Sequence, residues 1–169
     1  SLVPSATPVP SPTPTPSPTA TPTPTPIELS IRQVELTAND LIYSPSNQLI
    51  YCSIPSSAPT TGNTVTPLDP STGTVGAYTF LGSEPNKLAL SEDGQALWIG
   101  LDGAGSVRRF DIATQSAALQ FYLEGGDSFS GPFQARDLAV MPGTSDTVAV
   151  ARGNSGGTSI AVYDNGVRR

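Results

Sequence analysis

Apolar and polar residues alternate along most of the chain after residue 30, in short runs separated by turn-forming residues. Such alternation is typical of β-strands, and no stretch keeps the 3.6-residue period of a helix. The pattern therefore predicts an all-β domain, with an outer strand at 31–36 before the first full repeat. The further predicted strands are 40–44, 48–54, 63–69, 75–81, 87–91, 96–101, 106–111, 117–123, 137–141, 147–151 and 159–164.

The order of these runs repeats along the chain. Leu41, Leu88 and Leu138 hold the same place in three similar segments, 47 and then 50 residues apart. A period of about 40 to 50 residues made of short strands is the signature of propeller blades. We therefore expect a β-propeller segment of about three four-stranded antiparallel blades. Their expected bounds are about 37–82, 83–133 and 134–169, the last blade being incomplete.

A run that ends in aspartate recurs in each repeat, at Asp69, Asp111 and Asp164. A carboxylate at such a place can accept hydrogen bonds from the backbone N–H groups of the following turn. We therefore expect these three side chains to serve the blades themselves.

Two segments carry a resemblance to a known repeat. Residues 88–100 read Leu-Ala-Leu-Ser-Glu-Asp-Gly-Gln-Ala-Leu-Trp-Ile-Gly, and residues 65–75 read Val-Thr-Pro-Leu-Asp-Pro-Ser-Thr-Gly-Thr-Val. Together with 106–115 they resemble the YVTN-type β-propeller repeat of secreted bacterial proteins, often found beside immunoglobulin-like domains. The resemblance covers about 35–169 and implies that Trp98 lies between sheets. Propellers of this kind commonly close with about seven blades, so the remaining blades are expected partners.

The first 26 residues differ in composition from the rest. They contain ten prolines, seven threonines, four serines and no charged residue. Because proline fixes φ and removes backbone donors, neither helix nor sheet is expected there. We predict a disordered Pro/Thr-rich linker over 1–26, extending about 80 Å at about 3.1 Å per residue, before a domain at 27–169. A Thr-Pro run of this kind can also carry O-linked sugars.

Deletion of residues 1–26 is expected to leave the melting temperature of the domain unchanged within error. The reason is that this segment has no large apolar surface to bury against the blades. Differential scanning calorimetry of the full and shortened chains measures the effect. A clear drop in melting temperature would contradict the prediction.

Charge limits the range of partners. All charged residues follow Pro26, with fourteen acidic against eight basic side chains and a net charge of −6. Such a surface repels phosphate, so no nucleic-acid partner is expected. No apolar run approaches the roughly 18 residues of a membrane span, so no membrane insertion is expected. The chain begins without Met or a signal region, and we expect a piece of a longer protein that is secreted or on the cell surface.

Candidate catalytic chemistry is scarce. Residues 153–157 read Gly-Asn-Ser-Gly-Gly, which fits the Gly-x-Ser-x-Gly pattern of serine hydrolases. A nucleophilic serine needs a base such as histidine, and the chain has no histidine. Its single cysteine, Cys52, allows no intrachain disulfide and is expected to be a buried apolar residue. We expect no catalytic residue, no cofactor and no metal, with calcium at Glu92, Asp93 or Asp102 as the alternative.

The better candidate site comes from propeller geometry, because the first strand of each blade lines the central channel. Polar residues that enter these strands are expected at one mouth of the channel as a ligand rim. These candidates are Asn39, Asp40, Glu84, Asn86, Lys87, Arg136 and Asp137. The alternative is that a solvated channel tolerates polar residues without binding anything. The loop 124–134, with Phe129 and Phe133, is expected on the same face, where it either contacts a ligand or packs over the blade.

These observations favour a non-catalytic extracellular binding or scaffold module, tethered by its linker, with a protein or carbohydrate ligand. The alternative is a fragment of a propeller enzyme, lactonase-like or quinone-dependent dehydrogenase-like, whose catalytic residues lie in missing blades. Enzymatic activity is therefore left open, with non-catalytic function favoured.

Overall fold

The computed structural model describes residues 32–169, so the linker predicted at 1–26 lies outside the described residues. Within 32–169 the regular structure is β apart from one short 3-10 turn, Asp102–Ala104. The described part of the chain contains no helix with the length and apolar character that crossing a bilayer requires. The strands are β1 (Asp40–Ser44), β2 (Leu49–Ile54), β3 (Thr64–Leu68), β4 (Thr79–Phe80), β5 (Pro85–Leu90), β6 (Ala96–Leu101), β7 (Ser106–Asp111), β8 (Ser116–Tyr122), β9 (Gly126–Asp127), β10 (Gly131–Pro132), β11 (Gln134–Val140), β12 (Thr147–Asn154), β13 (Gly157–Asp164) and β14 (Val167–Arg168).

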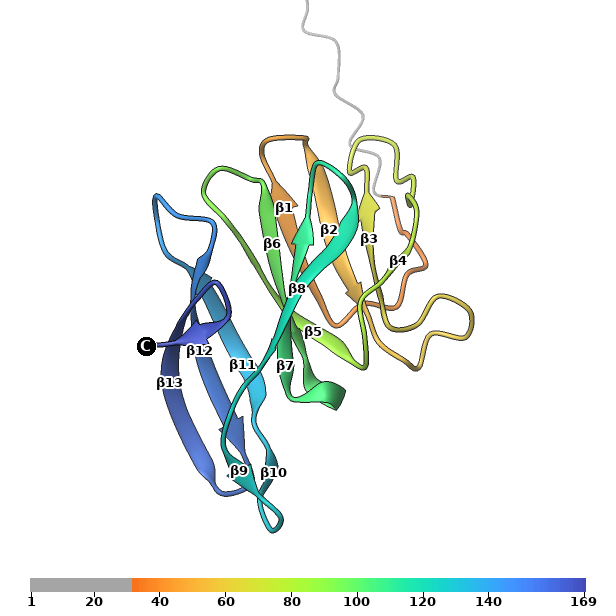
Figure 1. The fold of residues 1–169 in the computed structure, drawn as a ribbon. Helices are drawn as coiled ribbons and strands as arrows, with labels where there is room; N and C mark the ends of the chain where they lie inside the picture. The colour runs from red at the N-terminus through yellow and green to blue at the C-terminus, as the bar shows by residue number, and fades with distance from the viewer. Residues whose placement is uncertain (1–31) are drawn as a thin grey trace, which may run out of the picture. The chain divides into compact units, whose positions relative to one another are not determined.

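These strands form three four-stranded antiparallel sheets, in the orders β1-β2-β3-β4, β5-β6-β7-β8 and β11-β12-β13-β14 (Figure 1). A small hairpin, β9-β10, lies in the connection between the second and third sheets. Each strand pairs with the next along the chain, because short turns favour neighbouring antiparallel strands. This meander is the architecture of a propeller blade. The predicted all-β fold with about three four-stranded blades is confirmed.

The outermost strands differ most from the prediction. β4 is only Thr79–Phe80 instead of 75–81, because Pro67 on the facing strand has no N–H to donate. The Pro67 carbonyl accepts a hydrogen bond from the Gly76 amide instead of joining a regular ladder. In the third sheet the sequence pattern missed β14. A tight turn, with positive φ at Asn165 and Gly166, brings this strand back against β13.

The outer strand predicted at 31–36 is wrong for residues 32–36, which form no strand. Side chains hold this segment in place of ladder hydrogen bonds. The Arg32 guanidinium donates to the carbonyls of Ser71 and Thr72, at 3.2 and 2.6 Å. Leu36 packs on the cluster formed by Cys52, Ile54 and Ala58. The segment therefore covers one face of the first sheet without extending it.

Alternate residues of each middle strand pack against opposite neighbours. On β6, Leu97, Ile99 and Leu101 are buried against the first sheet, in a cluster that includes Tyr51. Trp98, between them in sequence, is buried in a second cluster with residues of the third sheet such as Val150. This two-sided burial follows from the two-residue period of a strand. It explains why β6 is apolar throughout.

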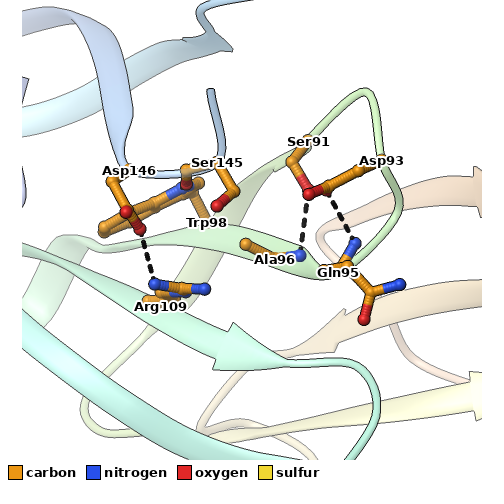
Figure 2. A network of polar contacts seen from close by, with 8 residues as sticks. All are labelled: Ser91, Asp93, Gln95, Ala96, Trp98, Arg109, Ser145 and Asp146. Atoms are coloured by element: carbon orange, nitrogen blue, oxygen red, sulfur yellow. Dashed lines mark hydrogen bonds and ion pairs between the residues drawn. The ribbon is translucent and has the colours of Figure 1, made fainter. Parts of the chain in front are cut away.

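The contact between the second and third sheets centres on Trp98, which is 0% exposed. Its indole Nε1 donates to the Ser145 carbonyl at 2.9 Å, and its ring meets Phe121 edge-on at 5.9 Å between centroids. Close by, Arg109 Nη1 pairs with Asp146 Oδ1 at 2.6 Å (Figure 2). Ser145 and Asp146 both belong to the β11–β12 loop of the third sheet. The predicted position of Trp98 between sheets is confirmed.

Cys52 is buried on the opposite side of the fold, in the cluster under Leu36. Burial raises the pKa of its thiol, because desolvation disfavours the thiolate. The expected core role of this cysteine is confirmed.

Candidate functional site

The first strands of the three sheets lie side by side. β5 contacts both β1 and β11, although these strands are far apart in sequence (Figure 1). The residues at the beginnings of these three strands therefore lie on neighbouring strands of one surface. All seven predicted rim residues lie on these strands or directly before them.

Two rim residues at the start of β1, in the first sheet, join this sheet to the second. Asn39 Nδ2 donates to the Pro85 carbonyl at 2.9 Å. Asp40 Oδ2 accepts a hydrogen bond from the amide of Leu88 at 3.1 Å, while Oδ1 accepts one from its own neighbour Leu41. These side chains link β1 to β5. Their observed contacts are structural.

Two further rim residues, Glu84 and Asn86, also form hydrogen bonds to other parts of the fold. The Glu84 carboxylate accepts a hydrogen bond from Ser56 Oγ in the first sheet's β2–β3 loop. Asn86 Nδ2 donates to Asp102 Oδ2 at 2.7 Å, which ties β5 to the turn after β6. Both contacts fix loops at one end of the sheets.

The remaining rim residues are Lys87, Arg136 and Asp137. Asp137 Oδ1 accepts a hydrogen bond from the next amide, of Leu138, at 2.9 Å. Among residues 32–169 the ion pairs are Arg109–Asp146 and Arg169–Asp164, so neither Lys87 nor Arg136 is in one. Arg136 and Asp137 are exposed and Lys87 is half-buried. These three side chains remain available to a ligand.

Irregular pairing sets the direction of these side chains. β5 has a bulge between Pro85 and Leu88, and β11 has one between Ala135 and Asp137. A bulge inserts an unpaired residue and turns its side chain away from the regular alternation. Lys87 and Arg136 both lie within these bulges, so the alternation of the sequence alone does not give their orientation.

Sequence reasoning missed one charged residue of this surface, Arg152. The strand prediction ended at Ala151, whereas β12 continues to Asn154. Arg152 pairs with Ala135 on β11, as Leu101 pairs with Pro85 on β5. The position is thus occupied by a buried aliphatic residue in the second sheet and by an arginine, 6% exposed, in the third. The signal that could have identified Arg152 is the change from leucine to arginine at equivalent positions of the second strands.

The Arg152 guanidinium is held by neutral groups. Its Nε donates to Ser159 Oγ at 2.9 Å, and its Nη1 donates to the Glu124 carbonyl at 2.6 Å. It also stacks on the Phe133 ring, with Cζ 4.8 Å from the ring centroid. Phe133 therefore packs over the third sheet. Packing over the blade was one of the two alternatives predicted for the loop 124–134.

A hollow of about 350 Å³ lies on the other face of the third sheet, where the Arg136 side chain lies over Gly153. We call it the arginine hollow, and its lining residues are Arg136, Ala151, Arg152, Thr158, Ser159 and Ile160. A second hollow of similar volume shares Thr158 and Ser159 with it and continues to Asp127, Phe133 and Asn154. We call this second hollow, at the tip of the β12–β13 hairpin, the polar groove.

The Gly-x-Ser-x-Gly segment forms the tip of that hairpin. β12 ends at Asn154 and β13 begins at Gly157, so Ser155 lies in a two-residue turn and not at a strand-to-helix elbow. Ser155 Oγ donates to the Ser130 carbonyl at 3.0 Å. A Cβ added at Gly153 would lie 3.3 Å from Arg136 Cγ, so this glycine leaves room for the arginine. The segment is a hairpin turn.

Two of the three strand-end aspartates accept hydrogen bonds from the turn that follows. Asp69 accepts from the hydroxyl and amide of Ser71, which lower its pKa to about 2, and Asp111 accepts from Thr114, which lowers its pKa. Asp164 differs, because the two-residue turn after it is too short to present free amides. It bonds to Arg169 and Thr147 instead, and Arg169 is the main cause of its lowered pKa.

Asp69→Asn is expected to lower the melting temperature slightly at pH 7. The folded-state pKa of about 2 lies below the usual 3.8, so the carboxylate stabilises the fold above pH 3.8 and this contribution is lost as the pH falls through about 2. Melting curves of both proteins between pH 7 and pH 2 measure the difference. A difference that stays constant down to pH 2 would contradict the assignment.

The three acidic residues considered for calcium, Glu92, Asp93 and Asp102, all accept hydrogen bonds from other groups of the chain. Asp93 Oδ1 accepts hydrogen bonds from Ser91 Oγ and the Gln95 amide (Figure 2). Glu92 accepts one from the Gly143 amide of the third sheet. No group of three or more His, Cys, Asp or Glu residues with metal-site geometry occurs in 32–169.

Comparison with known proteins gives the fold. No family model and no curated protein matches the chain. Among solved structures, Kuenenia stuttgartiensis hydrazine synthase matches with a TM-score of 0.63 and 19% identity, over 85% of this chain and 38% of that one. U3-55K matches with a TM-score of 0.59 and 14% identity, over 82% and 39%. The RRP9 WD40 repeats match with 0.55 and 15%, over 82% and 39%.

These neighbours define the class of protein. The chain has a WD40-like β-propeller fold and spans about two-fifths of the length of the structures it matches. At identities below 20% the likeness concerns the fold alone, because one fold hosts many functions.

Proposed function

We propose that this chain is a non-catalytic binding or scaffold module, built on YVTN-type propeller repeats. The observation that carries this proposal is the surface shared by β5 and β11. There Lys87 and Arg136 lie on adjacent strands with side chains that are in no ion pair within residues 32–169. Polar groups gathered on a rigid scaffold are a common basis for ligand binding.

A protein or carbohydrate ligand suits this surface. The β9–β10 loop beside the polar groove carries Phe129, which is 95% exposed. Exposed aromatic rings favour contacts with sugars and with protein surfaces. An extracellular location agrees with the Pro/Thr-rich composition of residues 1–26.

Further propeller blades are the second kind of partner that we propose. The outer face of the third sheet has a shallow hollow of about 150 Å³ and an Ile160 side chain that is 76% exposed. Ala149 occupies the place on this face that Trp98 fills in the second sheet, since each pairs with an alanine of the first strand. Volume is therefore available for side chains from a following sheet.

The carboxylate of Asp137 supports the same interface. Asp40 and Asp137 both accept the amide of the next residue through Oδ1. Asp40 Oδ2 also accepts the Leu88 amide of the following sheet. Asp137 Oδ2 has the corresponding place for the amide of a further blade.

The alternative function is a fragment of a propeller enzyme, lactonase-like or quinone-dependent dehydrogenase-like. The observation in its favour is that one similar structure is named as a synthase. Lactone hydrolysis or quinone reduction by the protein extended with its further blades would support this alternative.

An oligosaccharide array tests the binding proposal. We expect the 169-residue chain to bind a subset of the glycans, and Lys87→Ala with Arg136→Ala to reduce the signal at least about tenfold, as the loss of two charged contacts implies. Arg168→Ala is the matched control, because Arg168 is exposed on β14. Equal signals for all three proteins would contradict the proposal.

A further inference from the structure

The third sheet has one face that packs against the second sheet and one that does not. Val148 and Val150 of β12 lie in the cluster that contains Trp98. Successive residues of a strand point to opposite faces, so the alternate residues of β12 belong to the outer face. Together with their cross-strand partners, the apolar residues of this outer face are Ala139, Ala149, Ala151, Ile160 and Val162.

Strand pairing aligns three residues in one row across the outer face. Asp137 of β11 pairs with Ala151 of β12, and Ala151 pairs with Ile160 of β13. The row has a carboxylate at one end and an isoleucine, 76% exposed, at the other. All three residues line the shallow hollow of about 150 Å³. The small alanine in the middle lets a second surface approach the sheet closely.

An arginine stands directly before this row. Arg136 is the bulged residue before Asp137, and its side chain lies over Gly153 on the outer face. Arg136 and Ile160 both line the arginine hollow. Within residues 32–169 the ion pairs are Arg109–Asp146 and Arg169–Asp164, so neither Arg136 nor Asp137 is in one. Two unpaired charges of opposite sign therefore stand side by side at one end of the row.

The carboxylate of Asp137 has one oxygen to offer. Its Oδ1 accepts the amide of Leu138 at 2.9 Å, and no hydrogen bond to Oδ2 occurs in the described part of the chain. A carboxylate oxygen is a strong acceptor for an arginine guanidinium. Arg136 of the same chain leaves it unpaired, so the acceptor is open to an arginine of another molecule.

We propose that the outer face of the third sheet binds a second copy of this chain, about a two-fold axis that runs along the row Asp137–Ala151–Ile160. Each residue of the row then faces its own counterpart, so the two Ile160 side chains pack together. Arg136, one position from the axis, faces Asp137 of the second copy, and this contact occurs twice. Stacked sheets lie about 10 Å apart, a gap that the long arginine side chain and the aspartate bridge together.

The size of the face sets the strength of this contact. A three-stranded face of a few residues per strand is smaller than the about 800 Å² per partner of a stable interface. We therefore expect a weak dimer that dissociates on dilution. A following blade, where one is present, covers the same face and excludes the second copy. The contact needs no ligand and so goes beyond the proposed binding function.

Sedimentation velocity of two charge-reversal variants tests the two-fold contact. Arg136→Asp leaves two acidic residues at positions 136 and 137, and Asp137→Arg leaves two basic ones. Each variant then repels its own copy, and we expect its dimer dissociation constant to rise at least tenfold. An equimolar mixture of the two restores contacts between opposite charges. We expect the mixture to associate within about threefold of the unchanged chain.

Two further variants serve as controls. Arg168→Asp makes the same charge change at an exposed residue of β14, and is expected to leave association unchanged. Asp137→Asn keeps an oxygen that accepts the Leu138 amide and removes the charge, so it is expected to weaken association without altering the fold. Circular dichroism melting curves establish that every variant is folded.

Three results would overturn the proposal. The first is that the charge-reversal variants associate as strongly as the unchanged chain. The second is that both lose association and their mixture does not recover it, because the contact then does not join positions 136 and 137. The third is an unchanged chain that stays monomeric at several hundred micromolar, which would leave a following blade as the occupant of the face. The assay contains no glycan, so these results are independent of the proposed ligand binding.

Discussion

Replacing Trp98 with alanine is expected to lower the free energy of unfolding by about 3–5 kcal/mol, in the range of large-to-small substitutions in cores. The side chain is 0% exposed and fills the space between the second and third sheets. The substitution removes the edge-on contact with Phe121 and the hydrogen bond to the Ser145 carbonyl. The third sheet therefore loses its contact with a large, fully buried side chain of the second sheet.

Urea unfolding followed by circular dichroism measures this loss, since Trp98 is the single tryptophan. Tyr122→Ala is the control, because Tyr122 is an aromatic residue of the same sheet that is 69% exposed. We expect the control to change stability by less than about 1 kcal/mol, as surface substitutions usually do. Native Trp98 fluorescence is also expected to resist quenching by iodide. Ready quenching, or equal effects of both substitutions, would contradict the assigned packing.

The isolated 169-residue chain is expected to be marginally stable and to self-associate. Its third sheet has an apolar outer face with Ile160 exposed, and β14 is an open edge strand. Ile160→Lys is expected to weaken self-association at least about tenfold, because burial of one such side chain contributes roughly 1.5–3 kcal/mol.

Sedimentation velocity over a range of concentrations measures the association. Phe129→Lys makes the matched change at an exposed apolar residue in the β9–β10 loop, and is expected to leave association unchanged. Addition of downstream blades is expected to give a cooperative monomer. A sharp monomeric boundary for the wild-type chain, with cooperative unfolding, would show that the three sheets are self-sufficient.

The sequence by itself determined the repeat and most of the strands. Leu41, Leu88 and Leu138 mark three first strands, and β1, β6 and β7 have the predicted bounds. Local chemistry is sufficient here, because alternation, turn residues and the strand-end aspartates act within a few residues. The burial of Trp98 also follows from its place in the repeat.

Only the tertiary structure decided which polar residues are structural and which face a possible ligand. Asn39 and Asp40 are used by Pro85 and Leu88, which belong to another sheet. Arg136 turns out of its strand at a bulge, and the burial of Arg152 depends on Phe133 and Glu124 from a separate loop. These contacts join residues that are distant in sequence, and the two-residue period of a single strand contains no information about them.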